Sequence, residues 1–141
     1  MADLTNTVES TVTIGTTVHK VSVSETISLT NNNVVNQILE VSHSAETDIA
    51  KAGSIQPGGL KDLKYALIVN RDATNFVRLR VKDDGLHTFD VKLKPGEFFV
   101  LHSRELNVST TAGAFAAFTN LDTIAAQADT AACDVEIFLA N

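Results

Sequence analysis

The sequence predicts an all-β protein, a single-domain antiparallel β-sandwich or jelly roll over residues 1–141, on three observations. Apolar and polar residues alternate with period two along most of the chain, and no stretch of ten or more residues carries an apolar stripe of helical spacing. Turn residues separate the alternating segments at intervals of about ten to fifteen residues. The composition, with 44% hydrophobic and 20% charged residues, suits one ordinary core. We therefore expect about eight to ten strands.

The N-terminal segment alternates on both sides of a glycine. Valine and isoleucine share one face over residues 8–14, Gly15 permits a turn, and the alternation resumes over residues 21–29. Residues 1–14 are predicted to form an extended N-terminal arm or an edge strand of the sandwich. An arm would add a strand to the sheet edge of a neighbouring molecule, where backbone hydrogen bonds supply the affinity. The asparagines at 31–33 predict a turn.

The next part of the chain contains two strands separated by a long loop. A strand is predicted over residues 35–42, and the apolar pattern then lapses over residues 43–64, where Gly and Pro are frequent. A short helical turn is the interpretation of residues 45–51. The uninterrupted apolar run at residues 65–69 predicts a strand that is buried on both faces.

Residues 77–82 and 89–94 alternate so regularly that they predict a β-hairpin. Two aspartates and a glycine at 83–85 supply the turn between them. The inner face of this hairpin is expected to carry the apolar side chains of Val77, Leu79, Val81, Phe89, Val91 and Leu93. Asp90 is the one acid on the outer face, which otherwise carries a set of basic residues named here the basic strip: Arg78, Arg80, Lys82, Lys92 and Lys94.

The basic strip is the candidate protein interface, and two interpretations of it stay open. It is either a solvated face whose charges prevent unwanted association of the hairpin with other strands, or a surface that docks on an acidic region of another chain or of a second copy. Reversing Arg78, Arg80 and Lys92 to glutamate should then weaken assembly and leave the Tm nearly unchanged. The whole chain has a formal net charge of −6, which argues against general binding to nucleic acid.

The C-terminal part continues the strand pattern. Pro95 and Gly96 suit the central positions of a type II turn, and residues 97–101 should follow as another buried strand. The alanine-rich text that follows is interpreted as strands because threonine and glycine crowd it, and these strands are expected at residues 112–118, 124–128 and 135–139.

No catalytic residue, metal site or cofactor site is predicted. The histidines stand one to a segment, without the spacing by which one loop presents two metal ligands: His19, His43, His87 and His102. Cys133 is interpreted as a small buried residue, because its acidic neighbours would raise the pKa of the thiol. The longest nearly apolar stretch is far shorter than the ~20 residues that span a bilayer, so we expect no membrane insertion.

Three sequence passages resemble a known class of proteins. They are NRDATNFV at residues 70–77, LKPGEFFVL at residues 93–101 and the ending IAAQADTAACDVEIFLAN at residues 124–141. In this order of strands and turns the chain is similar to the small β-sandwich virion proteins of tailed bacteriophages, especially minor structural, head-decoration and cement proteins.

The resemblance implies a non-enzymatic structural role. It implies a capsid decoration or cement protein that binds and stabilises the lattice of the major capsid protein, at the capsid surface of a virion assembled in the host cytoplasm. It also implies a homo-oligomer, with a trimer favoured, and no nucleic acid, membrane or cofactor as partner. The alternative is a tail, collar, baseplate or head-fibre component of the same kind of particle.

Two other classes of function fit the residues less well. A carbohydrate-binding β-sandwich would usually expose Trp or Tyr, and this chain has no Trp and one Tyr at the start of a buried strand. An enzyme of cupin type would need clustered metal ligands, which the scattered histidines do not offer.

Overall fold

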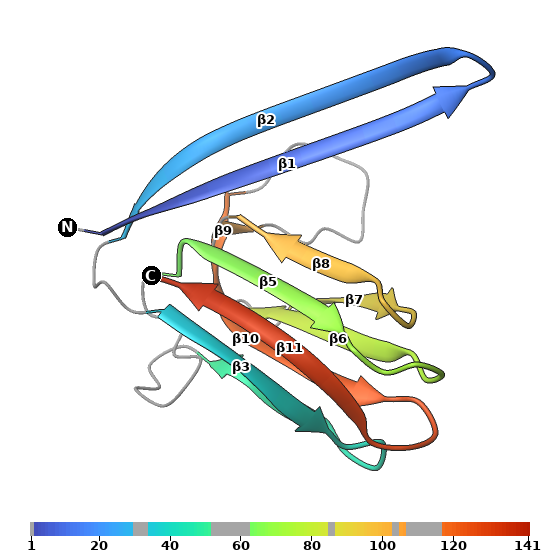
Figure 1. Ribbon diagram of the computed structural model, residues 1–141. Coiled ribbons are helices and arrows are strands. Elements are labelled where there is room, and N and C mark those ends of the chain that lie inside the picture. Colours follow the sequence, from blue (N-terminus) through green and yellow to red (C-terminus); the bar gives the residue numbers. More distant parts are fainter. Residues whose placement is uncertain (1, 30–33, 52–62, 85–86, 103–104, 107–116) are drawn as a thin grey trace.

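The computed structural model describes residues 2–29, 34–51, 63–84, 87–102, 105–106 and 117–141 (Figure 1). These residues form strands, turns and loops without a helix, which confirms the all-β prediction, and none of them forms a helix that is long and apolar enough to cross a membrane. The strands of the described residues are β1 (Ala2–Ile14), β2 (Thr17–Leu29), β3 (Val34–Val41), β4 (Thr47–Lys51), β5 (Tyr65–Asn70), β6 (Val77–Asp83), β7 (Thr88–Leu93), β8 (Phe98–Leu101), β9 (Glu105–Leu106), β10 (Thr119–Ala128) and β11 (Cys133–Ala140).

The body of the protein is a jelly roll of two packed sheets. One sheet has the order β3-β11-β5-β8, and the other has the order β4-β10-β6-β7, with the short β9 also paired to β10. The pairs are nested and antiparallel: β3 with β11, β4 with β10, β5 with β8, and β6 with β7. Eight strands paired in this way, with the first against the last, make the jelly-roll form of the β-sandwich. Figure 1 shows the two layers, with β3, β11, β5 and β8 in front.

The core lies between the two sheets and follows from the alternation of the strands. Val77, Leu79 and Val81 of β6 are fully buried and face the interior, as the period-two pattern predicts. β11 contributes Val135 and Ile137 in the same way from the other sheet. Burying each such side chain stabilises the fold by roughly 1.5–3 kcal/mol, so this layer is the main source of the stability of the fold.

The segment expected to be a long loop with a helical turn contains a strand instead. Residues 47–51 form β4, which pairs with β10 through Ala50 and Ile124. Ile49 is 1% exposed, so burial against the core and pairing with β10 override the helix propensity of the neighbouring Ala, Glu and Lys. The Gly- and Pro-rich part of that loop and the turn at 31–33 lie outside the described residues.

Two further strand predictions need correction or qualification. β8 was expected to be buried, but it is the edge strand of its sheet, and Phe98 is 65% exposed on the outer face. The inner face of β5 is buried as predicted, whereas Leu67 and Val69 on its outer face are half-buried. Most of the strand predicted at 112–118 lies outside the described residues, and Phe118 precedes β10 without joining it.

The N-terminal residues form a projecting hairpin, in which β1 pairs with β2 in a sheet of their own. Gly15 has a φ of 62°, as its place in the connecting turn requires. The arm is therefore a two-stranded ribbon over residues 2–29, and in the described residues β1 is not the edge strand of either body sheet. The tip of the ribbon lies clear of the body (Figure 1).

The base of the hairpin is fixed to the outer face of the β3-β11-β5-β8 sheet. A small apolar cluster joins the two parts, in which the hairpin supplies Leu4, Ile27 and Leu29, and the body supplies Tyr65, Leu67, Val100, Phe138 and Ala140. The Tyr65 hydroxyl donates a hydrogen bond to Asn6 Oδ1 at 3.3 Å, and His102 Nε2 lies 2.6 Å from Glu25 Oε2. These contacts hold the first third of the ribbon and leave the rest extended.

Candidate interaction surfaces

The basic strip lies on the outer face of the β4-β10-β6-β7 sheet. Arg78 stands opposite Lys92 in the β6–β7 register, and Arg80 stands opposite Asp90. Lys82 continues the row on β6, and Lys94 follows the end of β7. The structure therefore places Arg78, Arg80, Lys82 and Lys92 on one side of the sheet, as the alternation requires, and Lys94 is exposed just beyond the end of β7.

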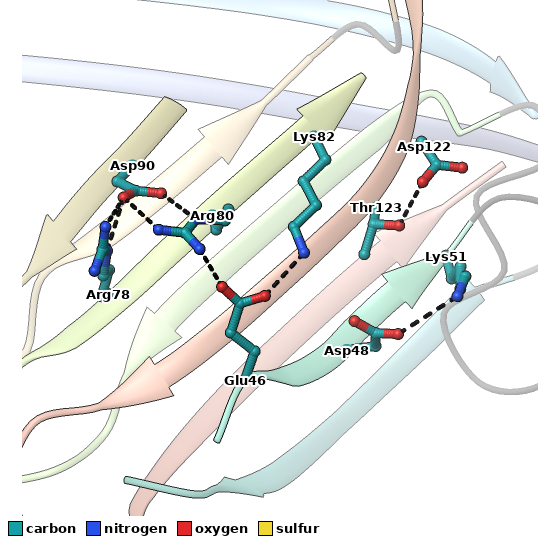
Figure 2. Close-up of polar contacts among 9 residues, drawn as sticks. All are labelled: Glu46, Asp48, Lys51, Arg78, Arg80, Lys82, Asp90, Asp122 and Thr123. Carbon is teal, nitrogen blue, oxygen red and sulfur yellow. Dashed lines mark hydrogen bonds and ion pairs between the residues drawn. The ribbon is translucent and has the colours of Figure 1, made fainter. Parts of the chain in front are cut away.

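The arginines and Lys82 are engaged in an ion-pair network (Figure 2). Arg78 Nε donates to Asp90 Oδ2 at 2.7 Å, and Arg80 Nε donates to Asp90 Oδ1 at 2.8 Å. Glu46, just before β4, accepts a further bond from Arg80 and one from Lys82 Nζ at 2.8 Å. Sequence reasoning missed Glu46, because it lies in a segment whose strand pairing depends on β10, a distant part of the chain.

Electrostatics keeps this network ionised at neutral pH. Hydrogen bonds from Arg80 and Arg78, together with their charges, lower the pKa of Asp90 to about 2. The hydrogen bond from Lys82 and the neighbouring positive charges also lower the pKa of Glu46. The carboxylates of Asp90 and Glu46 therefore offset part of the positive charge of the strip. Their ion pairs with Arg78, Arg80 and Lys82 connect β6 to β7 and to the residue before β4.

The other end of the strip is more available to a partner. Lys92 Nζ lies 3.9 Å from the centroid of the Phe76 ring, in a cation–π contact. Lys94 is exposed beside the turn formed by Pro95 and Gly96. Within the described residues, neither lysine forms an ion pair with an acidic side chain. The free positive charge of the strip is therefore concentrated at Lys92 and Lys94.

A second surface, which the sequence only partly revealed, is the apolar face of the hairpin. The β1–β2 register puts Val8 opposite Val23 and Ser10 opposite Val21, and the same face continues to the tip. We name as the hairpin apolar face the aliphatic side chains beyond its base, which are between 50% and 66% exposed: Val8, Val12, Ile14, Val21 and Val23. The opposite face is mostly Thr and Ser, with Val18 as an exposed aliphatic residue near the tip.

A third surface is the outer face of the β3-β11-β5-β8 sheet beyond the hairpin base. Val34 and Ile38 of β3 and Phe98 of β8 are 51%, 62% and 65% exposed. The strand registers place them on the same face as Phe138 and Val69, which are half-buried. Glu136, in an ion pair with Arg71, stands between Ile38 and Val69 on this face, and Asn36 stands between Val34 and Ile38. This area is named here the outer sheet face. It lies on the side of the sandwich that carries the hairpin.

The two central passages of the phage resemblance build one structural unit. Asn70 is fully buried, and its Nδ2 donates to the carbonyl oxygens of Asn75 at 2.9 Å and Leu93 at 3.0 Å. The backbone of Asn70 also bonds with Gly96 and Glu97, so the 70–77 passage is tied to the turn of the 93–101 passage. Their residues thus fix loops rather than present a reactive group.

The remaining chemically interesting residues serve the fold. Asp83 is 3% exposed and accepts hydrogen bonds from the Thr119 hydroxyl at 2.6 Å and the His87 backbone N–H at 2.7 Å. Cys133 is 1% exposed, and burial, followed by the negative charge of Asp72, raises the pKa of its thiol. Among the described residues, no three His, Cys, Asp or Glu side chains come together as a metal-binding group.

These geometries leave two kinds of surface with a capacity for binding: the lysine end of the basic strip, and the apolar surfaces of the hairpin and the outer sheet face. Both are broad and lie on strands, which suits contact with another macromolecule. Comparison of the chain with protein-family models, curated proteins and solved structures finds no match.

Proposed function

We propose that the protein is a non-enzymatic structural protein of a tailed-phage particle, and that it decorates and stabilises the lattice of the major capsid protein. The observation that carries the proposal is the exposed apolar surface outside the jelly roll, above all the hairpin apolar face with Val21 at 65% and Ile14 at 66% exposed, which indicates a protein that works by assembling with other chains. Contiguous exposed apolar surface of this kind marks sites of contact between proteins.

The choice of a virion rests on the resemblance together with the fold. Jelly rolls occur in viral capsid proteins, in lectins and in cupins, so the architecture is compatible with a virion role without selecting it. The passages at 70–77 and 93–101 that carry the resemblance are joined by the hydrogen bonds of the buried Asn70. The resemblance therefore concerns residues that hold the fold together. The hairpin apolar face lies outside these passages, so the surface that binds a partner is inferred from the exposed residues of this chain.

The alternative of carbohydrate binding is weakened by the position of the aromatic residues. Sugar rings stack on exposed Trp and Tyr side chains. Tyr65 is 7% exposed beneath the hairpin base, where its ring packs edge-on against Phe138 at a centroid distance of 6.2 Å. It is therefore unable to present its ring to a sugar.

Incubation of the purified protein with particles tests the proposal. The probes are expanded, DNA-free heads and, separately, tail tubes of a tailed phage whose genome encodes this chain. We expect saturable co-sedimentation with heads and a regular added density in negative-stain images. Binding to tail tubes alone would move the protein to the tail alternative, and binding to neither would refute a virion role.

The lysine end of the basic strip provides the matched test of electrostatic docking. Lys92→Glu with Lys94→Glu reverses the two charges that form no ion pair and keeps Arg80, Lys82, Asp90 and Glu46 unchanged; because position 92 stands opposite Arg78, the Tm of the variant is measured alongside. We expect at least a tenfold weaker affinity for heads at low salt if the strip docks on an acidic surface. Unchanged affinity would favour the solvated-face interpretation of the strip.

A further inference from the structure

The described residues of the body leave the hairpin apolar face uncovered. Isolated two-stranded ribbons are marginally stable in water, and they gain stability when an apolar face packs on another element. In this hairpin the packing stops after Leu4 and Ile27, and Val8, Val12, Val21 and Val23 beyond them are half or more exposed. The tip lies away from the described strands of the body (Figure 1), so those strands leave this part of the ribbon uncovered.

The base of the hairpin already shows which surface fits this face. There, the same face of the ribbon packs through Leu4, Ile27 and Leu29 on the outer face of the β3-β11-β5-β8 sheet. The unfilled part of that sheet face exposes side chains of the same apolar kind, Val34, Ile38 and Phe98. Each molecule therefore carries one uncovered apolar ribbon and one sheet face whose exposed apolar side chains flank the Arg71–Glu136 ion pair.

We propose that the hairpin apolar face of one molecule packs on the outer sheet face of a second copy, so that the copies exchange hairpins. The contact extends an interface that the chain already makes at the hairpin base. Its size also favours exchange, because a stable interface buries about 800 Å² per partner and the few aliphatic side chains of one ribbon fall short of that. A reciprocal contact buries the ribbon and the sheet face of each copy together.

A triple substitution on the ribbon tests the donor side of the contact. Val8→Thr, Val21→Thr and Val23→Thr keep the β-branched shape and the strand propensity, and they place hydroxyls on the hairpin apolar face. Sedimentation velocity of the protein alone, over about 1 to 100 μM, is expected to show an oligomer for the wild type and at least a tenfold higher Kd for the variant. The matched control is Val18→Thr, which makes the same change on the opposite face and should leave the Kd unchanged.

The acceptor side is tested by Ile38→Thr with Phe98→Thr on the outer sheet face. This double variant should also dissociate. In a mixture with the hairpin variant one of the two reciprocal contacts is intact, so hetero-dimers should form with a Kd between that of the wild type and those of the variants alone. This partial restoration distinguishes this contact from hairpins that pack on each other, since mixing would rescue nothing in that case.

The inference does not depend on the phage proposal, because the test contains no particle. A wild-type monomer over the whole concentration range would overturn it, as would equal weakening by Val18→Thr or a mixture of the two variants that associates no more tightly than each variant alone. Circular dichroism and the Tm of each variant show whether the body is folded. Loss of binding to heads with self-association intact would refute the proposed function alone.

Discussion

At the scale of single residues, Asn70 does the most to fix the body. Its buried amide bridges the loop after β5 and the end of β7, through bonds to Asn75 and Leu93. Its own Oδ1 accepts a hydrogen bond from the Asp72 backbone N–H at 3.0 Å, which starts the local turn. One side chain thus joins a strand of each sheet.

Replacing Asn70 by alanine should lower the free energy of unfolding by about 2–3 kcal/mol, because two carbonyl groups lose a donor at a buried position. Urea unfolding measures the change. Asn36→Ala, an exposed position on β3, is the control and should stay within about 0.5 kcal/mol of the wild type. A similar small effect at Asn70 would mean that water replaces its amide.

Asp83 makes stability depend on pH in the acidic range. Hydrogen bonds from Thr119 and His87 lower the pKa of Asp83 to about 2 in the folded state, from an ordinary value of 3.8. The unfolded chain therefore takes up the proton first, and the stability that Asp83 confers is complete above pH 4 and is lost as the pH falls towards 2. Asp90, whose pKa is also about 2, acts in the same sense.

Asp83→Asn should therefore be less stable than the wild type at pH 7 and lose less of its stability between pH 4 and 2. Urea midpoints at a series of pH values measure this. Asp84→Asn changes an exposed neighbour and should keep the pH dependence of the wild type. Parallel curves for Asp83→Asn and the wild type would contradict the assignment.

At the scale of elements, the turn between β7 and β8 depends on Gly96. Its φ is 77°, and the Glu97 backbone N–H donates to the Lys94 carbonyl at 3.0 Å, as in the type II turn that Pro95 and Gly96 predict. Gly96→Ala should cost about 1 kcal/mol or more, since no neighbouring atom lies within 4 Å of an added Cβ and the cost is conformational. Gly96→Asn, which tolerates this conformation better, should cost less; thermal unfolding separates the two.

The network across β6 and β7 sets a second expectation for an element. Glu46→Gln removes the charge that Arg80 and Lys82 share, and it should cost up to about 1 kcal/mol at low salt. Because salt screens exposed ion pairs, the difference from the wild type should shrink in 1 M NaCl, at which the screening length is about 3 Å. A difference that does not depend on salt would mean that Glu46 acts through packing.

The same network changes what charge reversal of the basic strip is expected to do. Glutamate at positions 78 and 80 would stand beside Asp90 and Glu46, so the Tm should fall, and weaker assembly could not be assigned to the strip itself. The reversal at Lys92 and Lys94 avoids most of this repulsion and is therefore the informative experiment.

At the scale of the whole molecule, the jelly roll pairs the ends of the body with each other. β3 pairs with β11 and β4 pairs with β10, so these pairs form only after most of the chain has come together. Topologies dominated by such distant pairings fold in milliseconds to seconds. Stopped-flow refolding of the wild type should show this range, and folding within microseconds would contradict the nested pairing.

The sequence predicted the faces of strands better than their partners. Alternation placed Val77, Leu79 and Val81 in the core and the basic strip outside it, because period two depends on the local backbone. It missed β4, a short strand whose form is decided by pairing with β10, and therefore also missed Glu46. It identified the apolar residues of the hairpin but not their exposure, because burial depends on where the whole ribbon lies.

The buried Cys133 gives the protein a practical advantage. The chain has no other cysteine, and a thiol that is 1% exposed with a raised pKa reacts slowly with maleimides. A cysteine introduced at Thr16, in the exposed turn of the ribbon, would therefore take up a fluorescent dye selectively. Energy transfer between donor- and acceptor-labelled molecules could then follow the approach of ribbon tips as they assemble.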